Sequence, residues 1–222
     1  VGLELAHGAV ELGALFVALR GEHGDGHDYV AAVVGRAGAA LVERELPLAL
    51  PQIVVADALA ALQTLARAWL ETFAVKRIAL TGSNGKTTTK ALTTAILTQI
   101  AHTHATPGNF NNEIGVPLTL LALRADHRYA VIEMGCGKPG DIDELAAIAP
   151  PHVALVTNVA AAHLERLGSE EGVARAKAGI YRGLLDGGIA VINADDAFAH
   201  YFREQAGAHR VIDFAIDGPA AV

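Results

Sequence analysis

The chain has 222 residues, of which 52% are hydrophobic and 18% are charged, and its formal net charge is −7. This length can bury the core of one large domain or two small ones, and the composition excludes a disordered chain. The acidic balance argues against nucleic-acid binding, because a phosphate backbone requires a basic protein face. With Cys136 as the one cysteine, an internal disulfide is excluded and we expect a reducing, cytoplasmic setting.

Neither secretion nor membrane insertion is indicated by the sequence. The N-terminus lacks a charged segment followed by an apolar one. The longest stretch without Asp, Glu, Lys or Arg, Leu145–Leu164, contains prolines and polar residues, so it predicts a loop and a buried strand. Because the chain begins with Val1 and has a single methionine, Met134, we expect a trimmed start.

Short β-branched runs alternate with amphipathic segments of helical length, which predicts an α/β fold with a mostly parallel sheet. Strands are expected at Ala14–Arg20, Ala39–Val42, Gln52–Ala56, Arg77–Thr81, Tyr129–Met134, Val153–Asn158, Ile189–Asn193 and Arg210–Ala215. Helices are expected after Asp57, from about Lys86, and over Gly115–Leu123, Asp141–Ile148, Glu170–Leu184 and Ala197–Ala206. A boundary near Phe73–Lys76 predicts two domains, residues 1–75 and 76–222.

The helix after Asp57 has a clear apolar pattern. Asp57 is a good N-cap, and Leu59, Leu62, Leu65 and Trp69 recur at helical spacing. We therefore expect these four side chains to share one buried face, with Trp69 serving core packing.

A glycine-rich segment connects the strand Arg77–Thr81 to the helix that begins near Lys86. Glycines let backbone N–H groups converge on an anion, and the N-terminus of a helix adds a favourable dipole. Lys86 can contact the β- and γ-phosphates of a nucleotide, and the Thr87 hydroxyl can bind Mg²⁺. Leu80 stands where the longer P-loop pattern has glycine, so the match is to the shorter T-G-x-x-G-K-T form. The predicted phosphate loop consists of Thr81, Gly82, Ser83, Asn84, Gly85, Lys86, Thr87 and Thr88.

Two polar residues fall where a parallel sheet places its ligands, near the carboxyl ends of strands. Glu133 lies near the end of Tyr129–Met134 and can face a cation there; the alternative is a salt bridge at the sheet edge. His163 follows Val153–Asn158 after a short loop, and taken alone such a histidine is more often solvated or structural than a ligand.

Lys177 lies within an apolar helical pattern. Val173, Ile180 and Leu184 recur at helical spacing in Glu170–Leu184, and Lys177 is on or beside their face. A lysine there either extends past its neighbours to solvent or serves a site. Burial lowers the pKa of a lysine, which makes its amine reactive toward carbon dioxide.

Several segments, in this order, resemble the Mur ligase family of ATP-dependent amide ligases. They are TGSNGKTT (Thr81–Thr88), NFNNEIGVPLTLL (Asn109–Leu121), VIEMG (Val131–Gly135), TNVAAAHLERLGS (Thr157–Ser169), AKAGI (Ala176–Ile180) and NADD (Asn193–Asp196). The segments LFVALRG (Leu15–Gly21) and DGHDYV (Asp25–Val30) resemble the N-terminal domain of such ligases, which binds a uridine nucleotide. The resemblance covers nearly the whole chain.

Within the family, the Asn109–Leu121 segment is most similar to the ligases that add D-alanyl-D-alanine to UDP-N-acetylmuramoyl-tripeptide. The resemblance implies a uridine-nucleotide domain at residues 1–75 and part of a P-loop-type ATPase domain at 76–222. It also implies that the tripeptide carboxylate is phosphorylated by ATP and that the dipeptide amine then attacks the acyl phosphate. The family's C-terminal domain would lie beyond Val222, so we expect this chain alone to be inactive.

The resemblance assigns a role to each candidate residue. Lys86 and the loop amides hold ATP, and Thr87 with Glu133 binds a first Mg²⁺. A second Mg²⁺ lies near His163 and Lys177, the latter as an N-carbamate. Lys86, His163 and Lys177 are thereby implied to be catalytic. The muramoyl substrate is placed by three asparagines, for which an Asn-rich turn is the alternative: Asn109, Asn111 and Asn112.

Two segments depart from the family pattern. Leu5–Gly8 stands where a Ser/Thr-Asp-Ser/Thr-Arg stretch usually meets the uridine, and Ala178–Gly179 stands where Gly-Glu commonly follows the lysine.

Two other functions remain open from the sequence. One is the ligase that adds the third residue of the stem peptide, which shares the phosphate loop. The other is a non-catalytic nucleotide-binding module that acts through a partner. Folylpolyglutamate synthetases are disfavoured, because their loop usually ends Gly-Lys-Gly-Ser.

Overall fold

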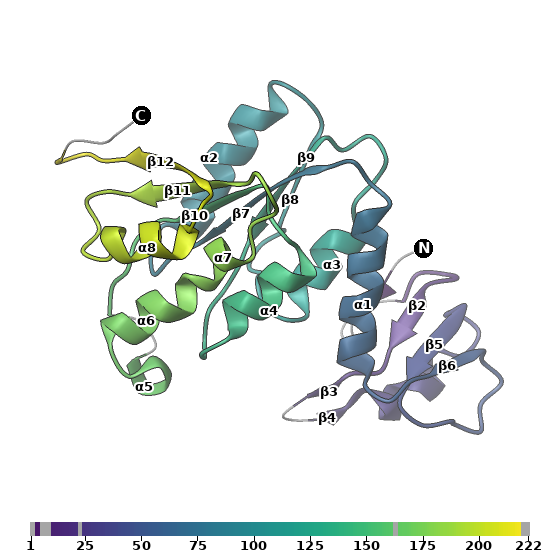
Figure 1. Ribbon diagram of the computed structural model, residues 1–222. Helices are drawn as coiled ribbons and strands as arrows, with labels where there is room; N and C mark the ends of the chain where they lie inside the picture. The colour runs from purple at the N-terminus through teal and green to yellow at the C-terminus, as the bar shows by residue number, and fades with distance from the viewer. Residues whose placement is uncertain (1–2, 5–9, 22–23, 162–163, 219–222) are drawn as a thin grey trace. The chain divides into compact units, whose positions relative to one another are not determined.

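The computed structural model describes residues 3–4, 10–21, 24–161 and 164–218 (Figure 1). The chain forms two compact units, Val1–Ala66 and Arg67–Val222. Their division falls within helix α1 (Ala58–Glu71), whereas the boundary expected from the sequence lies between residues 75 and 76. Over the described ranges, no helix is long and apolar enough to cross a membrane.

The first unit is built on a small parallel sheet of four strands in the order β1-β2-β5-β6. Its strands are β1 (Leu3–Glu4), β2 (Leu15–Val17), β5 (Ala39–Val42) and β6 (Gln52–Val54). A short antiparallel hairpin, β3 (Arg20–Gly21) and β4 (Gly24–Asp25), precedes the 3₁₀-helix η1 (Gly26–Val33). Phe16, Val30 and Val42 are among the buried side chains that form its core.

The second unit contains a six-stranded, wholly parallel sheet in the order β12-β11-β10-β7-β9-β8. Its strands are β7 (Lys76–Thr81), β8 (Thr103–Ala105), β9 (Tyr129–Glu133), β10 (Val153–Val156), β11 (Ile189–Asn193) and β12 (Arg210–Phe214). Strands β9 (YAVIE) and β10 (VALV) are nearly continuous apolar runs, which is typical of parallel strands covered on both faces.

Helices cover both faces of this sheet (Figure 1). Helix α2 packs on β8 and β9 on one face, and α7 packs on β10 and β7 on the other. The helices of this unit after α1 are α2 (Lys86–Thr98), α3 (Gly115–Leu121), α4 (Asp141–Ile148), α5 (Leu164–Leu167), α6 (Glu170–Lys177), α7 (Gly179–Arg182) and α8 (Ala199–Ala206). The α/β class with a small first domain and a mostly parallel second sheet is therefore confirmed.

The buried face of α1 was predicted correctly at Leu62 but not at Leu59, Leu65 and Trp69. Ala58, Leu62, Ala66 and Leu70 are buried, whereas Trp69 is 41% exposed. Trp69 packs its ring edge-on against Phe73 instead of entering the core. Small alanines mark the true face, and a pattern that counts only large side chains cannot detect them.

The helix expected over Glu170–Leu184 is interrupted. It divides into α6 and α7 around Ala178, and α7 ends at Arg182. The edge strand β8 was not predicted, because its sequence THA is short and half-polar. Strands β7, β9, β10 and β12 each differ from their predicted bounds by one or two residues at one end. Strand β11 and helix α4 match their predicted bounds.

Candidate phosphate-binding site

The strand order of the large sheet reverses beside β7. From β7 the chain proceeds to β8 and β9 on one side, and later to β10, β11 and β12 on the other. In open parallel sheets, ligands bind at the carboxyl ends of strands where the order reverses. Thr81 ends β7 at this point and begins the predicted phosphate loop. The loop therefore lies at the position where sheets of this topology bind their ligands.

The loop depends on two glycines. Gly82 has a φ of 154°, and a Cβ on it would collide with the side chain of Thr157. Gly85 has a φ of 78° and is the N-cap of α2, where no side chain caps the helix. The first N–H groups of a helix have no partner within it, so the start of α2 presents uncapped donors to an anion.

A neighbouring loop braces the phosphate loop. Ser83 N donates to Asn158 O at 2.9 Å, and Asn84 N donates to Asn158 Oδ1 at 3.0 Å. The Thr157 hydroxyl donates to Asn84 O at 2.7 Å. Strand β11 supports this brace in turn, because Asn193 Nδ2 donates to Thr157 O at 3.0 Å. The sequence did not predict this bracing, although the segments that provide it are TNVAAAHLERLGS and NADD.

Lys86 and Thr87 begin α2 and extend in different directions. Lys86 Nζ folds over the loop and donates to Gly82 O at 2.7 Å. The Thr87 hydroxyl points to the end of β9 and donates to Glu133 Oε2 at 3.2 Å. The structure thus brings together a lysine at the anion position and a hydroxyl–carboxylate pair beside it.

Glu133 is 2% exposed and has three side-chain partners. Besides Thr87, they are Asn111, whose Nδ2 donates to Oε1 at 2.8 Å, and Lys90, whose Nζ lies 3.1 Å from Oε2. From the sequence, Glu133 was interpreted as a cation ligand or, alternatively, as part of a salt bridge. In the structure it forms an ion pair with Lys90 and also contacts Thr87. Strand β9 lies between β7 and β8, so this ion pair is not at the edge of the sheet.

The three asparagines of the loop before α3 have different environments. Asn111 contacts Glu133 as described, and its backbone oxygen accepts from Gly135 N at 2.7 Å. Asn112 Oδ1 accepts from Gly115 N at 2.8 Å at the start of α3, as in an Asn-rich turn. Asn109 is exposed.

Lys177 ends α6 and is 3% exposed, on the buried side that its helical spacing predicted. Its pKa is lowered to about 8, chiefly by burial and also by the positive charge of Lys86, while Cys136 acts in the opposite direction. Burial raises the pKa of the Cys136 thiol, so this cysteine is a poor nucleophile. Lys177 is thus a buried amine whose pKa is lowered mainly by burial and to a smaller extent by the charge of the phosphate-loop lysine.

His163 lies outside the described residues, as does Leu5–Gly8. Within the parts of the chain that the structure describes, no three His, Cys, Asp or Glu side chains gather as a metal-binding group. A Mg²⁺ ion that accompanies a nucleotide needs only one or two carboxylates, because phosphates and waters supply its other ligands. Thr87 and Glu133 fit such an ion, since both present oxygen atoms.

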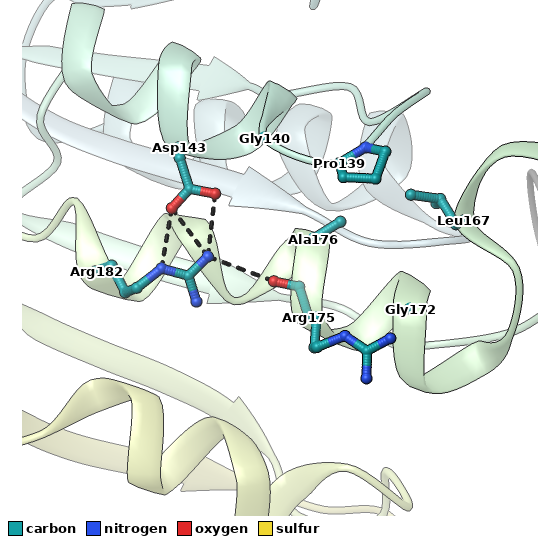
Figure 2. Close-up of a pocket in the computed structure, with 8 residues that line it drawn as sticks. All are labelled: Pro139, Gly140, Asp143, Leu167, Gly172, Arg175, Ala176 and Arg182. Atoms are coloured by element: carbon teal, nitrogen blue, oxygen red, sulfur yellow. Dashed lines mark hydrogen bonds and ion pairs between the residues drawn. The ribbon is translucent and has the colours of Figure 1, made fainter.

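A cavity of about 300 Å³ lies beside the break between α6 and α7 (Figure 2). Among its lining residues, Asp143 on α4 and Arg182 on α7 form an ion pair at 2.9 Å. The guanidinium of Arg175 points away from this ion pair (Figure 2). A Cβ on Gly179 would come within 2.8 Å of Asp143, so glycine lets α7 approach α4 closely.

Lys90 is a further buried residue of this site that was not predicted from the sequence. It lies one helical turn after Lys86 and is 6% exposed, although buried lysines are rare. The signal was available, because positions four apart on a helix share a face.

Comparison with known proteins supports these observations. The family model described as "Mur ligase middle domain" matches residues 80–222. The UDP-N-acetylmuramoyl-tripeptide–D-alanyl-D-alanine ligase of Escherichia coli is 50% identical over 186 residues, which are 83% of this chain and 41% of that protein. The crystal structure of MurF from Acinetobacter baumannii matches with a TM-score of 0.92 and 43% identity, over 96% of this chain and 47% of that chain.

A third relative was solved with a bound nucleotide. MurF ligase from Thermotoga maritima in complex with ADP matches with a TM-score of 0.89 and 33% identity, over 98% of this chain and 51% of that chain. The chain thus spans about half the length of these relatives.

Proposed function

The chain belongs to the Mur ligase family, and from this premise we propose that it carries the ATP-binding part of a ligase that joins D-alanyl-D-alanine to UDP-N-acetylmuramoyl-tripeptide. The observation that carries the proposal is the phosphate loop at the reversal of the sheet, with Glu133 against Thr87. The choice of substrates is supported by the relative from Escherichia coli, whose name states this activity.

The nucleotide proposed for this site is ATP. The N–H groups at the start of α2 receive its phosphates, and Lys86 exchanges its carbonyl partners for phosphate oxygens. The ADP bound to the Thermotoga maritima relative supports this assignment. All eight loop residues, Thr81–Thr88, form the cradle, although Ser83 and Asn84 also hold the loop to its brace.

Thr87 and Glu133 are proposed to hold the Mg²⁺ that accompanies ATP. A bound Mg²⁺ neutralises charge that develops on the transferring phosphoryl group. Lys86 contributes positive charge at the same place, and the braced loop fixes the phosphates in position. The γ-phosphoryl group then passes to the terminal carboxylate of the tripeptide, and the dipeptide amine attacks the acyl phosphate and expels phosphate.

Lys177 is proposed to act as an N-carbamate. Its lowered pKa leaves a larger fraction of the amine uncharged near neutral pH, and the uncharged amine can attack carbon dioxide. The new N–C bond forms with loss of one proton from nitrogen, and it replaces a cation with an anionic oxygen ligand. Together with His163, this carbamate is the proposed ligand set for a second Mg²⁺.

The acceptor substrate is proposed to contact the loop before α3 and residues 1–75. Asn109 is exposed and free to receive the muramoyl group, whereas Asn111 and Asn112 hold the loop in shape. The uridine nucleotide is assigned to residues 1–75 on the resemblance of Leu15–Gly21 and Asp25–Val30.

Two alternatives make different predictions. A ligase that adds the third stem-peptide residue would use the same phosphate loop with a single amino acid. A non-catalytic nucleotide-binding module has no need of a carboxylate aimed at Thr87 or of the buried lysine Lys177.

The test is phosphate release from ATP by the complete natural protein. UDP-N-acetylmuramoyl-tripeptide is supplied, and D-alanyl-D-alanine is added or withheld. We expect release to require both substrates. Release that follows a single amino acid and the shorter dipeptide precursor would identify the preceding ligase, and no release with either pair would favour the binding module.

A further inference from the structure

Lys90 occupies a position that the phosphate-loop motif does not explain. It lies three residues after Thr87 on α2, so the two side chains share one face of the helix. It is 6% exposed in a chain whose other charged groups mostly reach solvent. A lysine is almost never buried unless it is paired, so its partners indicate what it does.

The Lys90 ammonium group has two partners. Its Nζ lies 3.1 Å from Glu133 Oε2 and donates to Gly108 O at 2.7 Å. Oε2 is also the oxygen that accepts from the Thr87 hydroxyl. Lys90 therefore contacts the same carboxylate oxygen that faces the proposed Mg²⁺ position.

The charges of Glu133 and of its side-chain partners cancel. Glu133 contributes one negative charge, Lys90 contributes one positive charge, and the remaining side-chain partners, Thr87 and Asn111, are neutral. Lys86 adds a further positive charge one helical turn before Lys90 on α2. A divalent cation needs net negative charge from its ligands, and among the described contacts of Glu133 none remains.

We propose that Lys90 is a positioning residue that balances the charge of Glu133 and so makes Mg²⁺ binding depend on the phosphates of the bound nucleotide. The inference rests on the proposed function, because it takes Thr87 and Glu133 as the metal ligands. Lys90 keeps the carboxylate aimed at Thr87 without metal, and ATP brings the missing negative charge. Through Gly108 O, the same ammonium group ties the asparagine-bearing loop to the carboxylate.

The test compares the melting temperature of the complete natural protein with and without about 10 mM MgCl₂, first free of nucleotide and then with ADP. For the natural sequence we expect Mg²⁺ to raise the melting temperature only when ADP is present. Lys90→Gln removes the charge but keeps a donor for Gly108 O. We expect Mg²⁺ alone to raise its melting temperature by ~2–4 °C once the ion exceeds its dissociation constant about fivefold.

Matched variants identify the cause. Lys90→Arg keeps the charge and should behave like the natural protein. Lys90→Gln/Glu133→Gln removes both charges and should lose the response to Mg²⁺ alone. Lys76→Gln removes an exposed lysine charge from the other end of β7 and should change nothing.

Two results would overturn the inference. One is a response to Mg²⁺ alone in the natural protein, which needs no variant to fold. The other is a folded Lys90→Gln protein that still requires ADP for its response. If Mg²⁺ has no effect even with ADP, the metal assignment under the proposed function fails instead.

Discussion

The two parallel sheets of this chain differ in strand order, and that difference determines where a phosphate can bind. In the first unit the order β1-β2-β5-β6 follows the chain, so the described strands contain no reversal. In the second unit the order reverses beside β7, and the glycine-rich loop begins there. Parallel strands alone do not make a phosphate site. In open sheets, ligands bind where the strand order reverses, and a helix N-terminus at that position favours an anion.

The two regions also differ in how their polar groups are used. In the first unit, His27 Nδ1 pairs with Asp25 Oδ1 at 2.5 Å, and His27 Nε2 accepts from Glu43 N at 2.8 Å. These groups satisfy one another. In the second unit, Lys177 is buried without a hydrogen-bond or ion-pair partner among the described residues, and the start of α2 has no side-chain cap. Unsatisfied groups of this kind cost stability and are typical of functional sites.

Substituting one glycine in each region should produce the largest difference in stability between the two regions. Gly82→Ala places a Cβ against Thr157 at a φ that side chains rarely adopt, so we expect a loss of about 2–6 kcal/mol in the free energy of unfolding. Gly24→Ala, in the hairpin of the first unit, has open space around its new Cβ and serves as the control. Urea denaturation measures both. Equal effects of the two substitutions would contradict the proposed close packing of the phosphate loop.

Lys177→Met tests whether the site reduces stability. The pKa of Lys177 is about 8, below the ~10.4 of an exposed lysine, so folding must bury a charge below pH 8 and this cost disappears as pH rises from 8 to 10.4. In buffer free of carbon dioxide, we expect the variant to be more stable than the natural protein at pH 7 by about 3 kcal/mol, and the difference to vanish near pH 10. Melting curves at several pH values measure it. A difference that does not change with pH would refute the role of the buried charge.

Asp25→Asn tests the self-satisfied network of the first unit and should have the smallest effect. The backbone and side chain of His27 hold the pKa of Asp25 below its usual range, so its contribution to stability is present above the unfolded pKa of ~3.9 and is lost as pH falls below it. The advantage of the natural protein over Asp25→Asn should therefore shrink between pH 6 and pH 3. The melting temperatures of both proteins across this range provide the measurement, and an advantage that grows in acid would be inconsistent with this network.

Much of the fold could be predicted because its strands are buried and apolar. β11 and α4 have the bounds that the sequence predicted, since turn residues flank them on both sides. The buried face of α1 was predicted correctly only at Leu62, because two of its other members, Ala58 and Ala66, are small and do not stand out in a pattern of large apolar side chains. The close approach of Gly179 to Asp143 joins segments that are distant in the sequence, so helical periodicity could not reveal it.

The phosphate loop was the part of the site that sequence could predict, because its chemistry lies in eight consecutive residues. The sequence singled out Glu133 and Lys177 only as a strand-end acid and a lysine within an apolar pattern. Lys90 and the bracing by Thr157 were missed, since each depends on strands that are neighbours in space and not in sequence.

The most direct test of the proposed nucleotide site compares the affinity for ADP of the complete natural protein with that of its Lys86→Ala variant. Titration calorimetry measures both affinities. We expect Lys86→Ala to weaken ADP binding about 10- to 100-fold, because a charge-assisted contact to phosphate is lost. Lys76→Ala, at the start of the same strand, should leave the affinity unchanged. An unchanged affinity for Lys86→Ala would contradict the assignment of the loop at the carboxyl end of β7 as the nucleotide site.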